Sequence, residues 1–123
     1  MDELKGKNVL IVEDEEDIRE ILYDDLTFFG ATVECVENGS KGFDLLKTKP
    51  FDVVITDVLM ANGDGMELLK NIKEKLTIKS KLFICSGCNN LIKKEVESLG
   101  VIEIFEKPFN VHKMIESIVK SFE

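Results

Sequence analysis

The sequence repeats one pattern five times: a short apolar run, then a longer amphipathic segment. Runs such as Val9-Leu10-Ile11-Val12 and Val53-Val54-Ile55 show no alternation of polar and apolar residues. Unbroken runs of this kind are typical of strands that are buried on both faces of a parallel sheet. The expected strands are Asn8–Val12, Ala31–Val36, Asp52–Thr56, Lys81–Cys85 and Glu103–Phe105.

The segments between these runs carry apolar residues at helical spacing, which predicts helices packed on the sheet. The first segment ends at Gly30, an expected C-cap, and its apolar stripe consists of Ile18, Ile21, Leu22, Leu26 and Phe29. Alternating strands and helices with right-handed crossovers predict an α/β fold with helices on both faces. For five units we expect a doubly wound, flavodoxin-like parallel sheet in the order 2-1-3-4-5, with the second strand at an edge.

Length and charge limit the classes of function. The 123 residues suffice for one domain, and we expect residues 1–123 to form a single, stand-alone unit. A net charge of -8 without a basic stripe argues against direct binding of nucleic acid. No apolar stretch approaches the roughly 18 residues of a membrane span, so we expect no membrane insertion and a cytoplasmic location.

Polar residues follow the apolar runs at the points where the expected strands end. Glu13 and Asp14 follow the first strand, and Asp57 follows the third. Ser86 follows the fourth, and Lys107 follows the fifth. Because ligands of such sheets bind beyond the carboxyl ends of the strands, where the strand order reverses, we expect these side chains to form one site.

The residue types indicate the chemistry of this site. Neighbouring carboxylates repel one another and stay ionised together only around a cation, and oxygen ligands of this kind suit Mg²⁺. A carboxylate beside Mg²⁺ can attack phosphorus and form an aspartyl-phosphate. Lys107 and the Ser86 hydroxyl would contact the oxygens of the transferred group.

This ordered set, with Asp64-Gly65 and Lys107-Pro108-Phe109, resembles the receiver domain of bacterial two-component response regulators, in particular single-domain, chemotaxis-type regulators. The resemblance implies that Asp57 accepts phosphate from a histidine kinase or a histidine phosphotransfer protein. It implies that Glu13, Asp14, Asp57 and the backbone carbonyl of Leu59 hold Mg²⁺, and that Ser86 and Lys107 contact the phosphoryl group. It also implies a cis Lys107-Pro108 peptide bond, and only weak self-phosphorylation and autodephosphorylation rather than enzymatic turnover.

The resemblance further implies a switch that moves Ser86 and a residue of the fifth strand. The surface of the fourth helix, the fifth strand and the fifth helix then binds a downstream protein. The usual switch aromatic is replaced by Ile104, and the adjacent Phe105 is expected on the opposite face of the sheet.

The loop after the phosphoacceptor has Ala61 where the family usually has proline. The positions that tune dephosphorylation are Leu59 and Cys88, neither of which orients water well, so we expect a long-lived phosphoryl group.

Three alternatives stay open at this point. A haloacid-dehalogenase-like phosphatase uses similar residues, but its Asp-x-Asp motif would need an acid where Leu59 stands. Cys85 and Cys88 form a CxxC, which is compatible with a thiol–disulfide or redox-modulated protein. The third alternative is an interaction module that never carries phosphate, against which the complete set of site residues argues.

Overall fold

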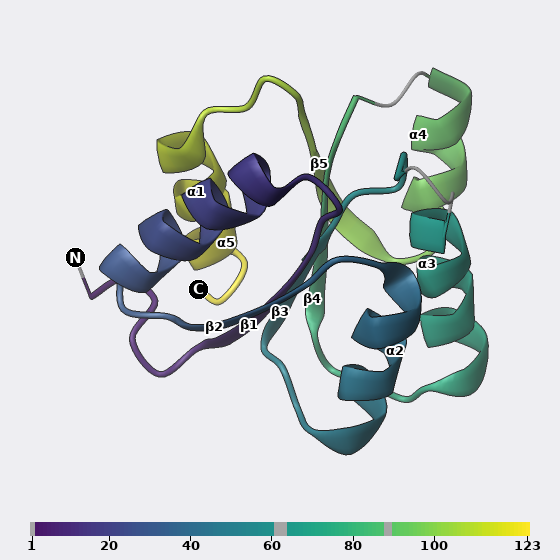
Figure 1. Ribbon diagram of the computed structural model, residues 1–123, viewed down its shortest axis with the longest axis horizontal. Helices are drawn as coiled ribbons and strands as arrows, with labels where there is room; N and C mark the ends of the chain where they lie inside the picture. The colour runs from purple at the N-terminus through teal and green to yellow at the C-terminus, as the bar shows by residue number, and fades with distance from the viewer. Residues whose placement is uncertain (1, 61–63, 88–89) are drawn as a thin grey trace.

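The computed structural model describes residues 2–60, 64–87 and 90–123. In this described part of the chain, five strands and five helices alternate, and Figure 1 shows their arrangement. The strands are β1 (Asn8–Val12), β2 (Thr32–Val36), β3 (Val53–Thr56), β4 (Lys81–Ser86) and β5 (Val101–Glu106). The helices are α1 (Glu16–Phe28), α2 (Gly39–Thr48), α3 (Asp64–Lys75), α4 (Asn90–Glu97) and α5 (Val111–Lys120). Within these described ranges, no helix has the length and apolar character needed to cross a bilayer.

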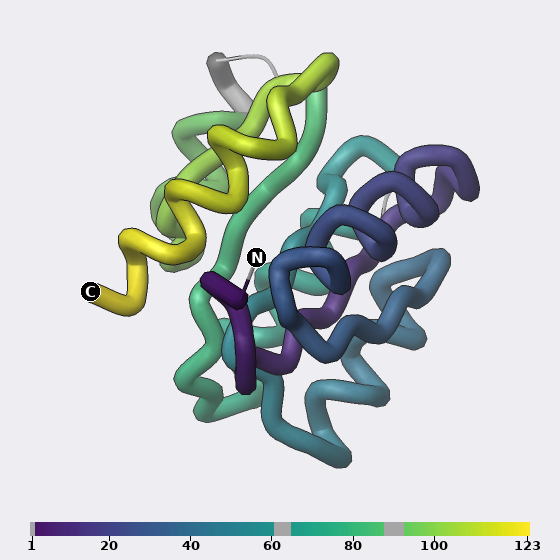
Figure 2. Tube along the Cα trace, turned by 90° about the vertical axis from the view of Figure 1, so that its left-hand side faces the viewer, coloured from purple at the N-terminus to yellow at the C-terminus, as the bar shows by residue number. Residues whose placement is uncertain are grey.

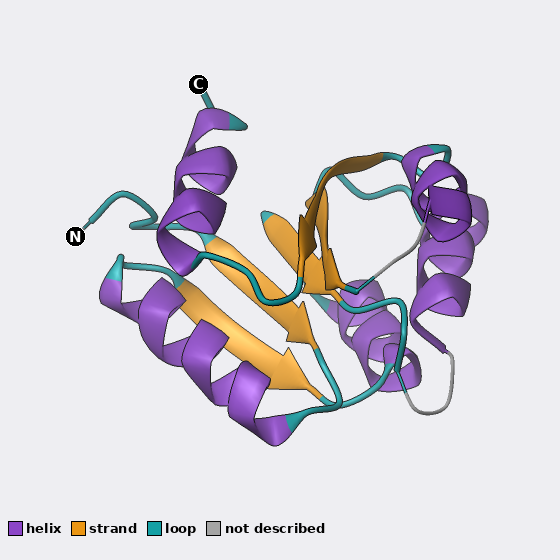
Figure 3. Cartoon of the chain, turned by 90° about the horizontal axis from the view of Figure 1, so that it is seen from above, coloured by secondary structure: helices purple, strands orange, loops and turns teal. Residues whose placement is uncertain are grey.

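The strands form one parallel sheet in the order β2-β1-β3-β4-β5, which confirms the predicted fold and places β2 at an edge. All paired strands run in the same direction, as the arrows in Figure 3 show. The carboxyl ends of β1 and β3, the two strands at which the order reverses, therefore lie side by side.

Helices cover both faces of the sheet and create two hydrophobic cores. Figure 2 shows α1 and α5 side by side on one face of the molecule. On this face of the sheet they pack over Val9, Ile11 and Phe83. On the other face, α2, α3 and α4 pack over strand residues that include Leu10 and Val12. Neighbouring residues of β1 thus enter different cores, and this explains why its apolar run is unbroken.

Several strand boundaries differ from those expected. Ala31 belongs to the turn after α1, because its N–H donates to the Leu26 carbonyl at 3.1 Å. Asp52 precedes β3, where its carboxylate accepts the Asn8 N–H at 2.8 Å. At its start, β5 pairs with β4 through an irregular register that passes over Ile102, whose side chain is 48% exposed. An exposed residue at a bulge weakens the apolar signal, so the sequence pattern missed the start of β5.

The predicted stripe of α1 is correct except at Ile21. Leu22 and Leu26 are buried against the sheet, and Gly30 ends the helix with a φ of 101°, as expected for a C-cap glycine. Ile21, however, is 49% exposed. Adjacent helical residues are rotated by about 100° from one another. Because Leu22 faces the sheet, Ile21 lies on the flank of the helix, where solvent reaches it.

Candidate functional site

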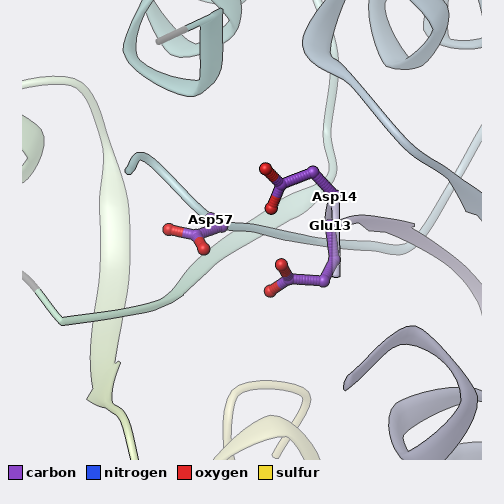
Figure 4. A group of neighbouring side chains, drawn as sticks. All are labelled: Glu13, Asp14 and Asp57. Carbon is purple, nitrogen blue, oxygen red and sulfur yellow. The ribbon is translucent and has the colours of Figure 1, made fainter. Parts of the chain in front are cut away.

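The acidic residues meet where the structure brings β1 and β3 together. Glu13 and Asp14 follow β1 directly, and Asp57 follows β3. The Asp57 N–H donates to the Val12 carbonyl at 3.1 Å, which extends the β1–β3 pairing to the site. One carboxylate oxygen from each acid lies within 4.8 Å of the others. Figure 4 shows the three carboxylates beside one another, with those of Glu13 and Asp14 directed toward the side on which Asp57 lies.

Lys107 reaches this cluster from the end of β5. Its Nζ lies 2.8 Å from Asp57 Oδ2 and 3.0 Å from Glu13 Oε1, so one ammonium joins two of the three carboxylates. The Lys107 N–H donates to the Ser86 carbonyl at 3.3 Å, which fixes the backbone at the end of β4. The Lys107-Pro108 peptide bond is cis, as the resemblance implied.

Burial makes these charges depend on one another. The side chains of Glu13 and Asp57 are almost fully buried. Desolvation is the largest influence on Glu13 and raises its pKa, although hydrogen bonds from the Glu15 N–H and from Lys107 oppose the effect. Burial alone would lower the pKa of Lys107, but its hydrogen bonds to Asp57 and Glu13 outweigh burial and raise that pKa. The two carboxylates therefore favour the protonated form of Lys107.

The cluster has the donor set and the charge that a divalent cation requires. Its three carboxylates supply only oxygen ligands, which suit Mg²⁺. Counted as ionised, they exceed the single charge of Lys107 by two, and one divalent cation balances this excess. The residues present therefore fit a magnesium site.

The two oxygens of Asp57 have separate partners. The Leu59 N–H donates to Oδ1 at 2.8 Å, and the Lys107 ammonium donates to Oδ2 at 2.8 Å. The Leu59 side chain is 50% exposed beside this carboxylate and offers no polar group there. A metal contact through the Leu59 carbonyl stays a prediction.

Ser86 contributes a buried hydroxyl without a partner. It is the last residue of β4 and is fully buried, and its Oγ forms no hydrogen bond within the described parts of the chain. Buried polar atoms without partners are rare because no hydrogen bond compensates for the free-energy cost of removing them from water. A bound group with acceptor oxygens would satisfy this hydroxyl.

Gly65 and Arg19 are parts of the site that the sequence reasoning did not assign a physical role. A Cβ at Gly65 would lie 2.0 Å from the Asp57 carbonyl oxygen and 2.7 Å from Val58 Cα, so only glycine allows α3 to start this close to the acidic loop. Arg19 of α1 donates from Nη1 to the Glu13 carbonyl at 2.8 Å. Its position on a charged helix gave no signal of this contact.

The proposed switch positions lie in different cores. Ile104 packs with the cluster under α2, α3 and α4, whereas Phe105 is buried in the cluster under α1 and α5. The prediction that Phe105 faces the opposite side of the sheet is therefore confirmed. Phe105 also stacks on Phe83, with ring centroids 5.8 Å apart. Ala61 and Cys88 lie outside the described residues.

Residues 9–119 match the response regulator receiver domain. The chain belongs to this family. The match supports the receiver interpretation over the phosphatase and the thiol–disulfide alternatives. Of the two cysteines in the CxxC, the described one, Cys85, is buried.

Known response regulators are similar to this protein in sequence over most of the chain. The response regulator ArlR of Staphylococcus epidermidis is 29% identical over 111 residues, which make up 90% of this chain and 50% of ArlR. The chain thus spans half the length of that relative. The response regulator receiver protein CpdR of Brucella abortus is 26% identical over 114 residues, or 93% of this chain and 95% of CpdR.

A similar solved structure is that of the response regulator TrrA from Thermotoga maritima in complex with Mg²⁺ and BeF. The two structures have a TM-score of 0.80 and 27% sequence identity, and the likeness covers 93% of this chain and 97% of that one.

We predict that Gly65→Ala destabilises the protein by about 1–3 kcal/mol, because the new methyl group would displace the Asp57 backbone. An alanine that fits a helix would instead stabilise it by up to about 1 kcal/mol, so the sign of the change is informative. Urea unfolding measures the change in the free energy of unfolding. The control is Gly87→Ala, whose Cβ meets no atom of the described residues within 4 Å and whose effect should stay below about 0.5 kcal/mol. A stabilised Gly65→Ala would contradict the proposed close packing.

Two serines allow a matched test of the unpaired hydroxyl. In the metal-free protein, Ser86→Ala should stabilise the fold by up to about 1 kcal/mol, because it removes a buried hydroxyl that has no partner among the described residues. Ser80→Ala should instead cost about 1 kcal/mol, because the Ser80 hydroxyl donates to the Phe51 carbonyl at 2.6 Å. Urea unfolding measures the change in the free energy of unfolding for both variants. Equal destabilisation of the two would show that Ser86 has a structural partner.

Proposed function

We propose that this receiver domain accepts a phosphoryl group on Asp57 from a histidine kinase or a histidine phosphotransfer protein. The observation that carries the proposal is the convergence of Lys107 with Glu13, Asp14 and Asp57 at one sheet edge. Glu13, Asp14 and Asp57, with the Leu59 carbonyl, would hold Mg²⁺. When bound, this ion neutralises charge on the phosphoryl oxygens and so favours transfer.

The proposed transfer uses groups that are already in place. An Asp57 oxygen attacks phosphorus, a P–O bond forms, and the P–N bond to the donor histidine breaks, leaving the imidazole to take up a proton from water. Lys107 then moves its ammonium from Asp57 Oδ2 to a phosphoryl oxygen, which keeps its charge paired. The Ser86 hydroxyl donates to another oxygen and gains the partner it lacks among the described residues.

The contact with Ser86 would also start the switch. Ser86 pairs with Glu106 in the sheet, and Ile84, two residues earlier on β4, pairs with Ile104. A shift of the β4 end toward the phosphoryl group would therefore change the packing of Ile104 under α4. Phe105 stacks on Phe83 in the other core, so we propose that aliphatic repacking at Ile104 replaces the usual movement of an aromatic ring.

The proposed output surface consists of α4, β5 and α5, and it would bind a downstream protein. On this surface Ile102 is exposed, and Lys93 lies 3.6 Å from Glu106 in an ion pair. The net charge of -8 favours a protein partner over nucleic acid. The cytoplasmic location and the stand-alone role of residues 1–123 remain predictions.

Incubation with a small phosphodonor and Mg²⁺ tests the acceptor. We expect the wild type to gain the mass of one phosphoryl group, and Asp57→Asn to gain none because the amide is a poor nucleophile. Intact-mass spectrometry measures the gain. Asp52→Asn is the matched control, since Asp52 lies at the opposite end of β3 and should leave phosphorylation intact. Equal labelling of Asp57→Asn, or no labelling of folded wild type with Mg²⁺ present, would contradict the proposal.

The lifetime of the phosphoryl group can be predicted from Leu59. Its apolar side chain lies next to the acceptor and cannot orient an attacking water, so wild-type protein should lose the label slowly. Leu59→Asn should lose it severalfold faster, because the amide can position water. Decay of the labelled, Mg²⁺-bound protein measures both rates. Rapid loss from the wild type, at the rate of the variant, would refute this role of Leu59.

A further inference from the structure

Arg19 makes a contact at the site although it is neither the proposed acceptor nor a proposed metal ligand. It lies on α1, beyond the exposed acidic residues of the first turn, and is partly buried. Its guanidinium turns back along the helix, and Nη1 donates to the main-chain carbonyl of Glu13 at 2.8 Å. A charged donor makes this a stronger hydrogen bond than one between neutral groups.

This bond completes the set of contacts that hold Glu13. The Glu13 N–H donates to the Val36 carbonyl at 3.1 Å. Its Oε1 lies 3.0 Å from Lys107 Nζ, and its Oε2 accepts the Glu15 N–H at 3.1 Å. Arg19 therefore binds the carbonyl, the one polar group of Glu13 that these other three contacts do not hold.

The Glu13 carbonyl is also the start of the peptide plane that leads to Asp14. Because a peptide unit is rigid, a donor that fixes the carbonyl also fixes the direction in which the chain enters Asp14. Asp14 is less buried than Glu13 and Asp57, and its carboxylate joins theirs within 4.8 Å. The Arg19 contact thus affects the direction of the Asp14 carboxylate through the backbone.

We propose that Arg19 is a positioning residue for the acidic pair and increases the affinity of the site for Mg²⁺. This inference rests on the proposed function of the site. Residues that orient metal ligands commonly change metal affinity by 10–100-fold, so we expect the loss of Arg19 to weaken binding about tenfold.

Electrostatics alone predicts the opposite result. Arg19 is a cation beside a cation site, and removing its charge should reduce repulsion and tighten binding of Mg²⁺. Positioning predicts weaker binding. The sign of the change therefore separates the two effects, and it does not depend on phosphorylation.

Calorimetric titration of Mg²⁺ into wild type, Arg19→Gln, Arg19→Lys and Lys41→Gln tests the proposal. We expect the dissociation constant to rise about tenfold in Arg19→Gln and about threefold in Arg19→Lys, which keeps the charge and a shorter donor. Lys41→Gln is the matched control, because it removes an exposed cation that pairs with Glu37. The affinity of this variant for Mg²⁺ should be unchanged or slightly higher.

Unfolding in urea without Mg²⁺ separates positioning from folding. Similar midpoints for wild type and Arg19→Gln, together with weaker Mg²⁺ binding, support the proposal. Unchanged or tighter binding by Arg19→Gln overturns it. If Arg19→Gln lowers the urea midpoint, the Mg²⁺ affinity of Arg19→Lys is the deciding measurement. An affinity for Mg²⁺ equal to that of the wild type in Arg19→Lys would then overturn the proposal. Absence of Mg²⁺ binding by the wild type would instead contradict the proposed function itself.

Discussion

The site depends on the balance between three crowded carboxylates and one ammonium. Glu13 and Asp57 are buried, and without a cation between them their repulsion would oppose the fold at the carboxyl edge of the sheet. Lys107 supplies that cation from the end of the edge strand β5, through contacts of 2.8 and 3.0 Å. The Lys107 ammonium holds two of the carboxylates together. Because it neutralises only part of their charge, the cluster still attracts a divalent cation.

The parallel sheet makes this balance possible. Direct pairing of β1 with β3 places Glu13, Asp14 and Asp57 together, and pairing of β4 with β5 places Ser86 beside the backbone of Lys107. The helices then adjust the fine geometry: Gly65 lets α3 start against the Asp57 backbone, and Arg19 of α1 holds the Glu13 carbonyl. The strands thus bring the reacting groups together, and the helices orient them.

The sequence predicted the sheet order well because burial on two faces leaves a strong local pattern in β1 and β3. It was less accurate where that pattern is weak. Ile102 lies exposed at an irregularity of β5, and Ile21 lies at the side of the α1 stripe, so neither follows the simple rule that apolar residues are buried. The residues at the strand ends were predictable as a group because the strand order alone brings them to one edge.

By itself, the sequence determined the fold class and the polar residues that follow the strands, because strand periodicity and the residue types at strand ends are local properties. Only the tertiary structure decided the distances within it. That Lys107 joins Asp57 to Glu13, that Ser86 Oγ is buried without a partner in the described chain, and that Arg19 returns to the Glu13 carbonyl all depend on how separate elements pack. These contacts arise between groups whose positions no local pattern specifies.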